Sequence, residues 1–123
     1  MGIVVNRCRV ATLDRVIVVN RFRVAAGDAD GFVRDVGAAL AALGERPGYL
    51  DGRLGHNLDD SELFTLVTRW VDVGSYRRAL SAYDVKVGAV PLLSRSIDEP
   101  SAYDEVAPGA DGESPALNRN VPR

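Results

Sequence analysis

The sequence predicts an α+β domain whose elements follow the order β-α-β-β-α-β, the split βαβ or ferredoxin-like arrangement with an antiparallel sheet. Three observations support this fold class. The apolar residues of 16–24 alternate with a period of two, those of 32–43 recur with helical spacing, and a polar turn divides residues 48–70 into two strands. With 123 residues, of which 46% are hydrophobic and 26% charged, the chain has the length and composition of one globular domain.

The first strand and the first helix are predicted from residues 16–44. Alternation places one set of side chains on a single face of the strand: Val16, Val18, Asn20, Phe22 and Val24. Ile17 and Val19 make the opposite face partly apolar as well, so both faces of the sheet should be covered. The helix carries a stripe made of Phe32, Val36, Leu40 and Leu43, with Asp28 or Asp30 as a candidate N-cap and Gly44 as a candidate C-cap.

The remaining elements follow from periodicity and from turn residues. Residues 48–56 and 62–70 read as two strands joined by a polar turn around His56 and Asn57. The stretch from Asp72 looks helical and should consist of two pieces, because Pro91 cannot donate the hydrogen bond that a continuous helix needs. A short strand near 101–106 completes the set, and residues 107–123, rich in Pro, Gly, Asp and Asn, are predicted to be a flexible tail.

The segment IVVNRCRVA at residues 3–11 returns at residues 17–25 with only Cys8 replaced, by Phe22. The second copy is predicted to be the working strand, since a helix that can cross the sheet follows only that copy. Residues 1–14 are therefore interpreted as an N-terminal extension that duplicates the first strand. Alternatively, the first copy competes for the same place, pairs on an exposed sheet edge or swaps between chains.

Composition argues against several classes of function. A net charge of −2 gives no reason to expect nucleic acid as a partner. No apolar run approaches the roughly 20 residues of a membrane span, so no membrane association and a cytoplasmic location are expected. One cysteine and one histidine cannot form an internal disulfide or an ordinary zinc site, and the glycines do not follow the pattern of a phosphate or dinucleotide loop. We therefore expect no metal and no cofactor.

Residues 15–106 resemble the antibiotic biosynthesis monooxygenase family. The resemblance lies in VIVVNRFRV before a helix, in RPGYLDGRLG, in LFTLVTRWVDVGSYRRAL and in the closing AVPLLSRSIDEPSAYDEV. It implies a dimeric α+β barrel in which two chains pack sheet against sheet, with a pocket between the sheet and the helices of each. The apolar outer face of the predicted sheet independently favours a homodimer, and Arg21, Arg23 and Arg69 on that face would need acidic or carbonyl partners inside the dimer or at its rim.

Three residues match pocket positions of that family: Asn20, Trp70 and Tyr76. The resemblance implies that the Asn20 amide and the Trp70 N–H donate to the substrate oxygen on which charge develops, and that Tyr76 relays a proton. Further substrate contacts are expected from Phe22, Phe64, Leu66 and Tyr83. The ordinary alternatives are a backbone or water partner for the amide and core packing for both aromatic residues.

The sequence also departs from parts of the family. The residue that heme-degrading relatives use as iron ligand is a histidine, whereas Ala89 or a neighbour stands at the matching place, so heme breakdown is not expected. Leu66 stands where anthrone oxygenases carry an asparagine, and His56 falls in a turn, where solvation is the common fate of a histidine. The prediction is a cofactor-free monooxygenase acting with O2 on an electron-rich aromatic or polyketide-like molecule. The alternative is a non-catalytic protein of the same dimeric fold that binds such a molecule or interacts with another protein.

Overall fold

A computed structural model of the chain describes residues 11–109. Nine elements follow one another: β1 (Thr12–Arg23), the 3-10 turn η1 (Ala26–Asp28), α2 (Ala29–Gly44), β2 (Tyr49–His56), β3 (Leu63–Trp70), α3 (Val73–Ser81), α4 (Tyr83–Gly88), α5 (Val90–Leu93) and β4 (Ala102–Val106). The predicted tail and most of the predicted extension, residues 110–123 and 1–10, lie outside the described residues. No helix between residues 11 and 109 is long and apolar enough to cross a bilayer.

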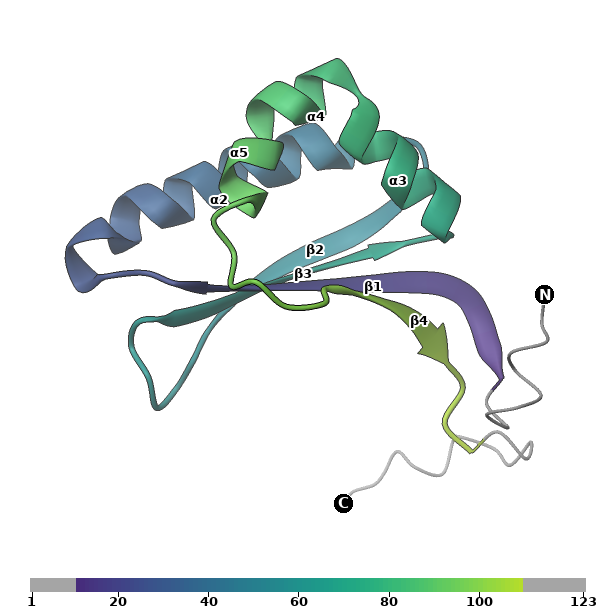
Figure 1. Cartoon of the computed structure of the whole chain (residues 1–123), viewed down its shortest axis with the longest axis horizontal. Helices are drawn as coiled ribbons and strands as arrows, with labels where there is room; N and C mark the ends of the chain where they lie inside the picture. Colours follow the sequence, from purple (N-terminus) through teal and green to yellow (C-terminus); the bar gives the residue numbers. More distant parts are fainter. Residues whose placement is uncertain (1–10, 110–123) are drawn as a thin grey trace.

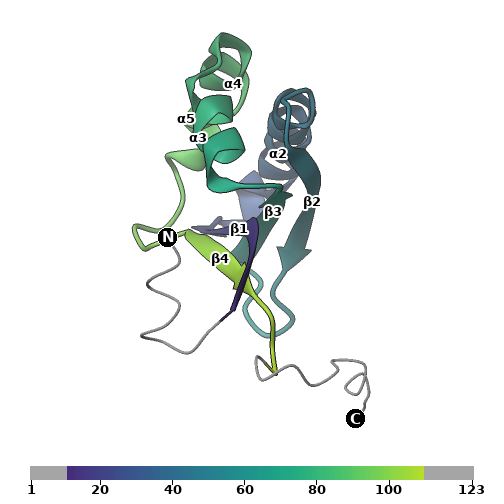
Figure 2. The ribbon, with the colours of Figure 1, turned by 90° about the vertical axis from the view of Figure 1, so that its right-hand side faces the viewer.

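The four strands form one antiparallel sheet in the order β2-β3-β1-β4. All helices lie on one face of this sheet, and Figures 1 and 2 show no element against the other face. The ferredoxin-like α+β prediction is therefore confirmed. β1 and β3 are the two inner strands, and the candidate site depends on β1, while β2 and β4 are the two edges.

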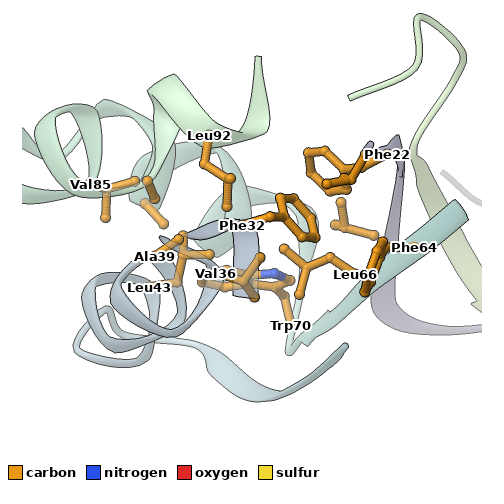
Figure 3. Packing of buried hydrophobic residues seen from close by; sticks show 14 of the residues in the cluster. Phe22, Phe32, Val36, Ala39, Leu43, Phe64, Leu66, Trp70, Val85 and Leu92 are labelled. Atoms are coloured by element: carbon orange, nitrogen blue, oxygen red, sulfur yellow. The ribbon is translucent and has the colours of Figure 1, made fainter. Parts of the chain in front are cut away.

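The core fills the space between the sheet and the helices (Figure 3). β3 alternates between partly and fully buried residues along its whole length, which places Phe64, Leu66, Thr68 and Trp70 on the inner face. From the helix side, α2 contributes Phe32, Val36, Ala39 and Leu43, all nearly inaccessible to solvent. Most stabilisation of the sheet therefore comes from this apolar layer rather than from strand propensity.

The start of β1 and the number of helical pieces after Asp72 differ from the sequence predictions, and α2 lacks a side-chain cap. β1 begins at Thr12 rather than Val16, because a register irregularity between these residues lets the strand continue through Asp14, whose φ is 63°. The helical stretch after Asp72 has three pieces rather than two, since the chain also turns extended at Ala82, where ψ is 141°. Asp28 is the N-cap of α2, but its side chain makes no capping hydrogen bond.

Three arginines on the outer face of the sheet form ion pairs within the chain. Arg21 binds Glu99 through two hydrogen bonds of 2.8 Å. Arg69 bonds the Asp51 carboxylate at 2.8 Å, and Arg23 bonds the carboxylate of Asp60 at 3.0 Å. The predicted need for acidic partners is thus met on the same chain, and these charges can accompany the face into an interface without being left unpaired.

Candidate active site

Asn20 is the polar residue on the inner face of β1. It lies opposite Leu66 of β3 and between Val18 and Phe22, which are 2% and 1% exposed. Asn20 itself remains partly exposed, and its amide makes no side-chain hydrogen bond to any residue in the range 11–109. A donor and an acceptor therefore face solvent or a bound molecule from within an otherwise closed apolar surface.

This opening has a cause in the backbone beside β1. The Val19 N–H donates to the Ser101 carbonyl at 2.7 Å, and the Ile97 N–H donates to the Arg21 carbonyl at 2.7 Å. Five residues, 97–101, thus run past only three residues of β1, 19–21. The connecting segment must leave the strand at this point, so Asn20 has no ladder neighbour on the β4 side of β1.

Trp70 ends β3 deep in the core, with none of its surface exposed. Its indole N–H donates to Thr68 Oγ1 at 3.0 Å, and its ring packs against Tyr49 and Tyr76 at centroid distances of 5.3 Å and 5.7 Å. The expected role as a donor to substrate is therefore corrected, because Thr68 already accepts the only hydrogen that the indole can donate. Trp70 instead forms the wall against which Tyr76 rests.

Tyr76 lies in the first turns of α3, whose start is fixed by Asp72. The Asp72 carboxylate accepts the Ser75 N–H at 2.8 Å, a normal N-cap bond. Burial raises the pKa of Tyr76 above its ordinary value, and the neighbouring Ser101 hydroxyl and Arg77 lower it by less. Its hydroxyl is consequently protonated at neutral pH and can donate a hydrogen bond, but it is a poor general base.

Ser101 connects the two polar residues in space. Its carbonyl holds β1 at Val19, the residue before Asn20, while its side chain lies near the Tyr76 hydroxyl. The structure thus places Asn20 and Tyr76 beside the same segment, residues 97–101, which runs along the β4 side of β1. Sequence reasoning missed Ser101 and Thr68; for Thr68 the signal was available, because it lies two residues before Trp70 on the same face of the strand.

The four expected substrate contacts divide into two groups. Phe22, Phe64 and Leu66 belong to the core, where Phe32 packs against the two phenylalanines at 5.0 Å and 5.1 Å (Figure 3). Tyr83 does not join them: it is 81% exposed at the first residue of α4. A side chain this exposed cannot line a pocket inside the domain, so the interpretation of Tyr83 as a substrate contact is corrected.

Two surface cavities border the domain. The larger, of about 520 Å³, lies where β1 enters α2 and includes Arg23, Phe32, Arg34 and Arg95 in its lining. The smaller, of about 270 Å³, lies beside the β2–β3 turn and is lined in part by Arg21, His56 and Phe64. Asn20, Trp70 and Tyr76 line neither cavity. Phe64 is the one proposed contact that reaches either of them.

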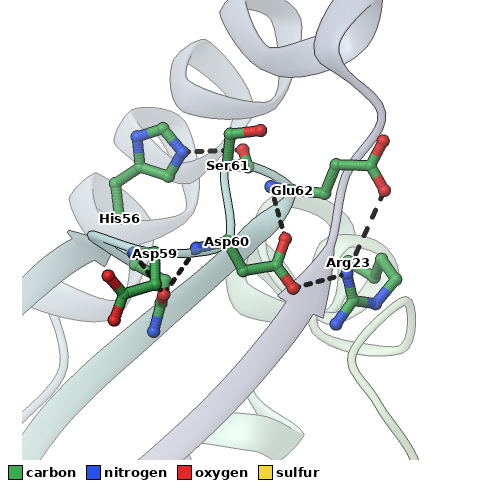
Figure 4. Close-up of polar contacts among 7 residues, drawn as sticks. Arg23, His56, Asp59, Asp60, Ser61 and Glu62 are labelled. Carbon is green, nitrogen blue, oxygen red and sulfur yellow. Dashed lines mark hydrogen bonds and ion pairs between the residues drawn. The ribbon is translucent and has the colours of Figure 1, made fainter.

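His56 serves the β2–β3 turn (Figure 4). Its Nε2 lies 2.7 Å from the Ser61 carbonyl, and its ring stacks on Phe64 at 4.2 Å. Asn57 shapes the same turn by accepting the N–H groups of Asp59 and Asp60, both at 2.8 Å. His56 is exposed, as the sequence suggested, and no group of three or more potential metal ligands occurs among the residues that the structure describes.

Comparison with known proteins supplies a family. Residues 15–88 match the family described as antibiotic biosynthesis monooxygenase. The structure is similar, with a TM-score of 0.63 and 27% identity over 73% of this chain and 91% of the other, to SnoaB, a cofactor-independent oxygenase from Streptomyces nogalater. A conserved protein from Methanosarcina mazei shares the fold at 21% identity, with a TM-score of 0.63 and coverage of 76% and 94%. No curated protein matches the chain.

Proposed function

Since the chain belongs to the antibiotic biosynthesis monooxygenase family, we propose that it is a cofactor-independent monooxygenase that oxidises an electron-rich aromatic or polyketide-like molecule with O2. The observation that carries the proposal is Asn20 on the inner face of β1, an amide that is not fully buried and has no side-chain hydrogen bond to any described residue. At a place that an apolar side chain could fill, an amide adds less to the core than an apolar residue would, so its presence favours a ligand with a carbonyl or phenolate oxygen.

In the proposed reaction the protein binds and orients the substrate and stabilises its charge. The substrate loses a proton to give a delocalised enolate or phenolate, which can pass an electron to O2 without a cofactor. The reacting methylene then gains one oxygen atom, and its two hydrogens leave with the second oxygen atom as water. The Asn20 amide and the Tyr76 hydroxyl donate to the oxygen on which charge develops, with Trp70 as the apolar wall behind Tyr76.

The substrate must be acidic in this proposal. Because burial raises the pKa of Tyr76, that residue cannot remove a proton readily at neutral pH. This same observation favours the second candidate, a protein of the same fold that binds an aromatic molecule without turnover. The two functions differ in whether O2 is consumed.

The test is the rate of oxygen uptake with an anthrone-type polyphenol. Under the proposal, Tyr76→Phe loses about 10²-fold in rate, the typical effect of removing one donor. Tyr103→Phe is the matched control, because Tyr103 lies half-exposed on β4 and its rate should stay at the parent level. Substrate binding without uptake by the parent protein would identify the binding function instead.

We also propose that two chains pack through the outer face of the sheet. All helices lie on the other face (Figure 2). Ile17, Val19 and Val67 leave the outer face apolar at its centre. Light scattering at micromolar concentration should then give twice the chain mass of 13.2 kDa. A monomer would contradict this arrangement while leaving the proposed chemistry at Asn20 and Tyr76 open to the oxygen-uptake test.

A further inference from the structure

We propose that residues 3–10 of one chain add as a strand to the outer edge of β4 in a second copy of the chain. Residues 3–10 lie outside the described residues, but their sequence is that of β1 with Cys8 in place of Phe22. The proposal uses an edge of the sheet rather than its face, and it does not depend on the proposed function.

β4 offers hydrogen-bonding groups along this edge. On its inner side, Ser101 accepts from Val19 and the Ala107 N–H donates to Ala11. Backbone groups alternate in direction along a strand, so every second residue, beginning with the one after Ser101, directs its N–H and C=O groups away from β1. These residues are Ala102, Asp104 and Val106, and β4 is the last strand of the sheet on that side.

The first copy matches the strand that β4 already accepts. β1 pairs with β4 in antiparallel register, with Ile17 opposite Tyr103 and Val18 opposite Ala102. Residues 3–10 repeat residues 17–24 except at Cys8. A second strand of the same sequence can therefore form the same kind of ladder on the other side of β4.

Residues 3–10 fit the position of β1 less well than they fit the outer edge of β4. Phe22 is 1% exposed and packs against the Phe32 ring at 5.0 Å. Cys8 in that position would leave much of this space empty. The outer edge of β4 imposes no such requirement, so the edge is the place that suits the duplicated segment.

Charge selects the register. Glu105 lies on the outer face, and its buried Oε1 has no hydrogen-bond partner within the described residues, with Arg69 3.9 Å away. Placing Arg7 opposite Glu105 supplies that partner and puts Cys8 opposite Asp104. Arg9 then lies beside the Tyr103 ring, a favourable contact for a cation.

Chain length requires that the donor be a second copy. In this register Val10 lies opposite Ala102, at the far end of β4 from Val106, whereas Thr12 of the same chain is fixed opposite Val106. The two positions differ by about 14 Å along β4 and by about 10 Å across it. Val10 and Thr12 are only two residues apart, and two residues span at most about 7 Å.

The experiment uses the native Cys8 of the full chain and a second cysteine introduced as Asp104→Cys. Opposite residues of an antiparallel pair lie within disulfide distance. Mild oxidation should therefore give species of two or more chain masses, multiples of 13.2 kDa, that a thiol reductant reverses. Tyr103→Cys is the matched control: it lies on the same strand but on the opposite face from Cys8, so it should cross-link much more slowly.

Three further variants make the result decisive. Cys8→Ser combined with Asp104→Cys should abolish the cross-link. In the Cys8 and Asp104→Cys background, Arg7→Glu should slow cross-linking about fivefold and Arg7→Lys should not, because only the former repels Glu105. The proposal is overturned if positions 103 and 104 cross-link at equal rates, if the disulfide forms within one chain, or if no cross-link forms.

Discussion

Asn20→Leu should make the protein more stable and inactive at the same time. Leucine is close to asparagine in size, and position 20 lies between Val18 and Phe22, which are 2% and 1% exposed. Burying a leucine side chain completely contributes about 1.5–3 kcal/mol. Because position 20 is partly exposed, about half of this is available, so we expect the free energy of unfolding to rise by about 1 kcal/mol and Tm by about 5 °C. Loss of the amide donor should lower the rate about 10²–10³-fold.

The assay pairs thermal unfolding, followed by circular dichroism, with oxygen uptake on an anthrone-type substrate. Asn57→Leu is the matched control, because the Asn57 carbonyl accepts two backbone N–H groups of the β2–β3 turn. That variant should lose about 1 kcal/mol and keep the parent rate. If Asn20→Leu is instead the destabilised variant, or turns over at the parent rate, then the Asn20 amide serves the fold and the proposed chemistry fails.

Three further substitutions test the structure itself. Gly48→Ala should cost about 2 kcal/mol or more in urea unfolding, since Gly48 has φ of 93° and an added Cβ would collide with the Ser75 side chain. Gly27→Ala should not have this cost, because nothing lies within 4 Å of an added Cβ there. Thr68→Val removes the acceptor of a buried indole N–H and should cost about 1–3 kcal/mol by the same measurement. Glu99→Gln should lower the urea midpoint near pH 7, and this difference from the parent should shrink as the pH is lowered below the ordinary carboxyl pKa. Hydrogen bonds from its arginine partner lower the pKa of Glu99, so its stabilisation is present above the ordinary carboxyl pKa and is lost as pH falls through the lowered one.

Much of the fold could be predicted because the strands carry strong patterns. β3 shows the predicted alternation at every residue from Leu63 to Trp70. The second copy of the duplicated segment was correctly identified as the working strand, β1, because a crossover helix follows it. The errors lie where the backbone departs from the regular strand or helix geometry that the side-chain pattern predicts. The irregular register near Asp14 hid the start of β1, and the break at Ala82 occurs without the glycine or proline that would have marked it.

The candidate site could be predicted only in part, because its contacts join residues far apart in the sequence. Arg21 and Glu99 are 78 residues apart, and nothing in either local sequence indicates that they meet. The donor capacity of Trp70 was interpreted as functional, although Thr68, only two residues away, consumes it. Tyr83 has the chemistry of a pocket residue, but the turn at Ala82 leaves it on the outside.

Periodicity identifies the face on which a side chain lies, but it cannot identify what covers that face. Asn20 shares its face with Val18 and Phe22, and by pattern alone it should be as buried as they are. It is accessible because residues 97–101 leave the strand beside it, between two backbone hydrogen bonds that hold their ends to β1. The irregular connection at residues 97–101 therefore determines whether this amide is buried without a partner or accessible to a ligand. The residues that hold the connection, Ser101 and the Arg21–Glu99 pair, should affect the site as much as the side chains that face it.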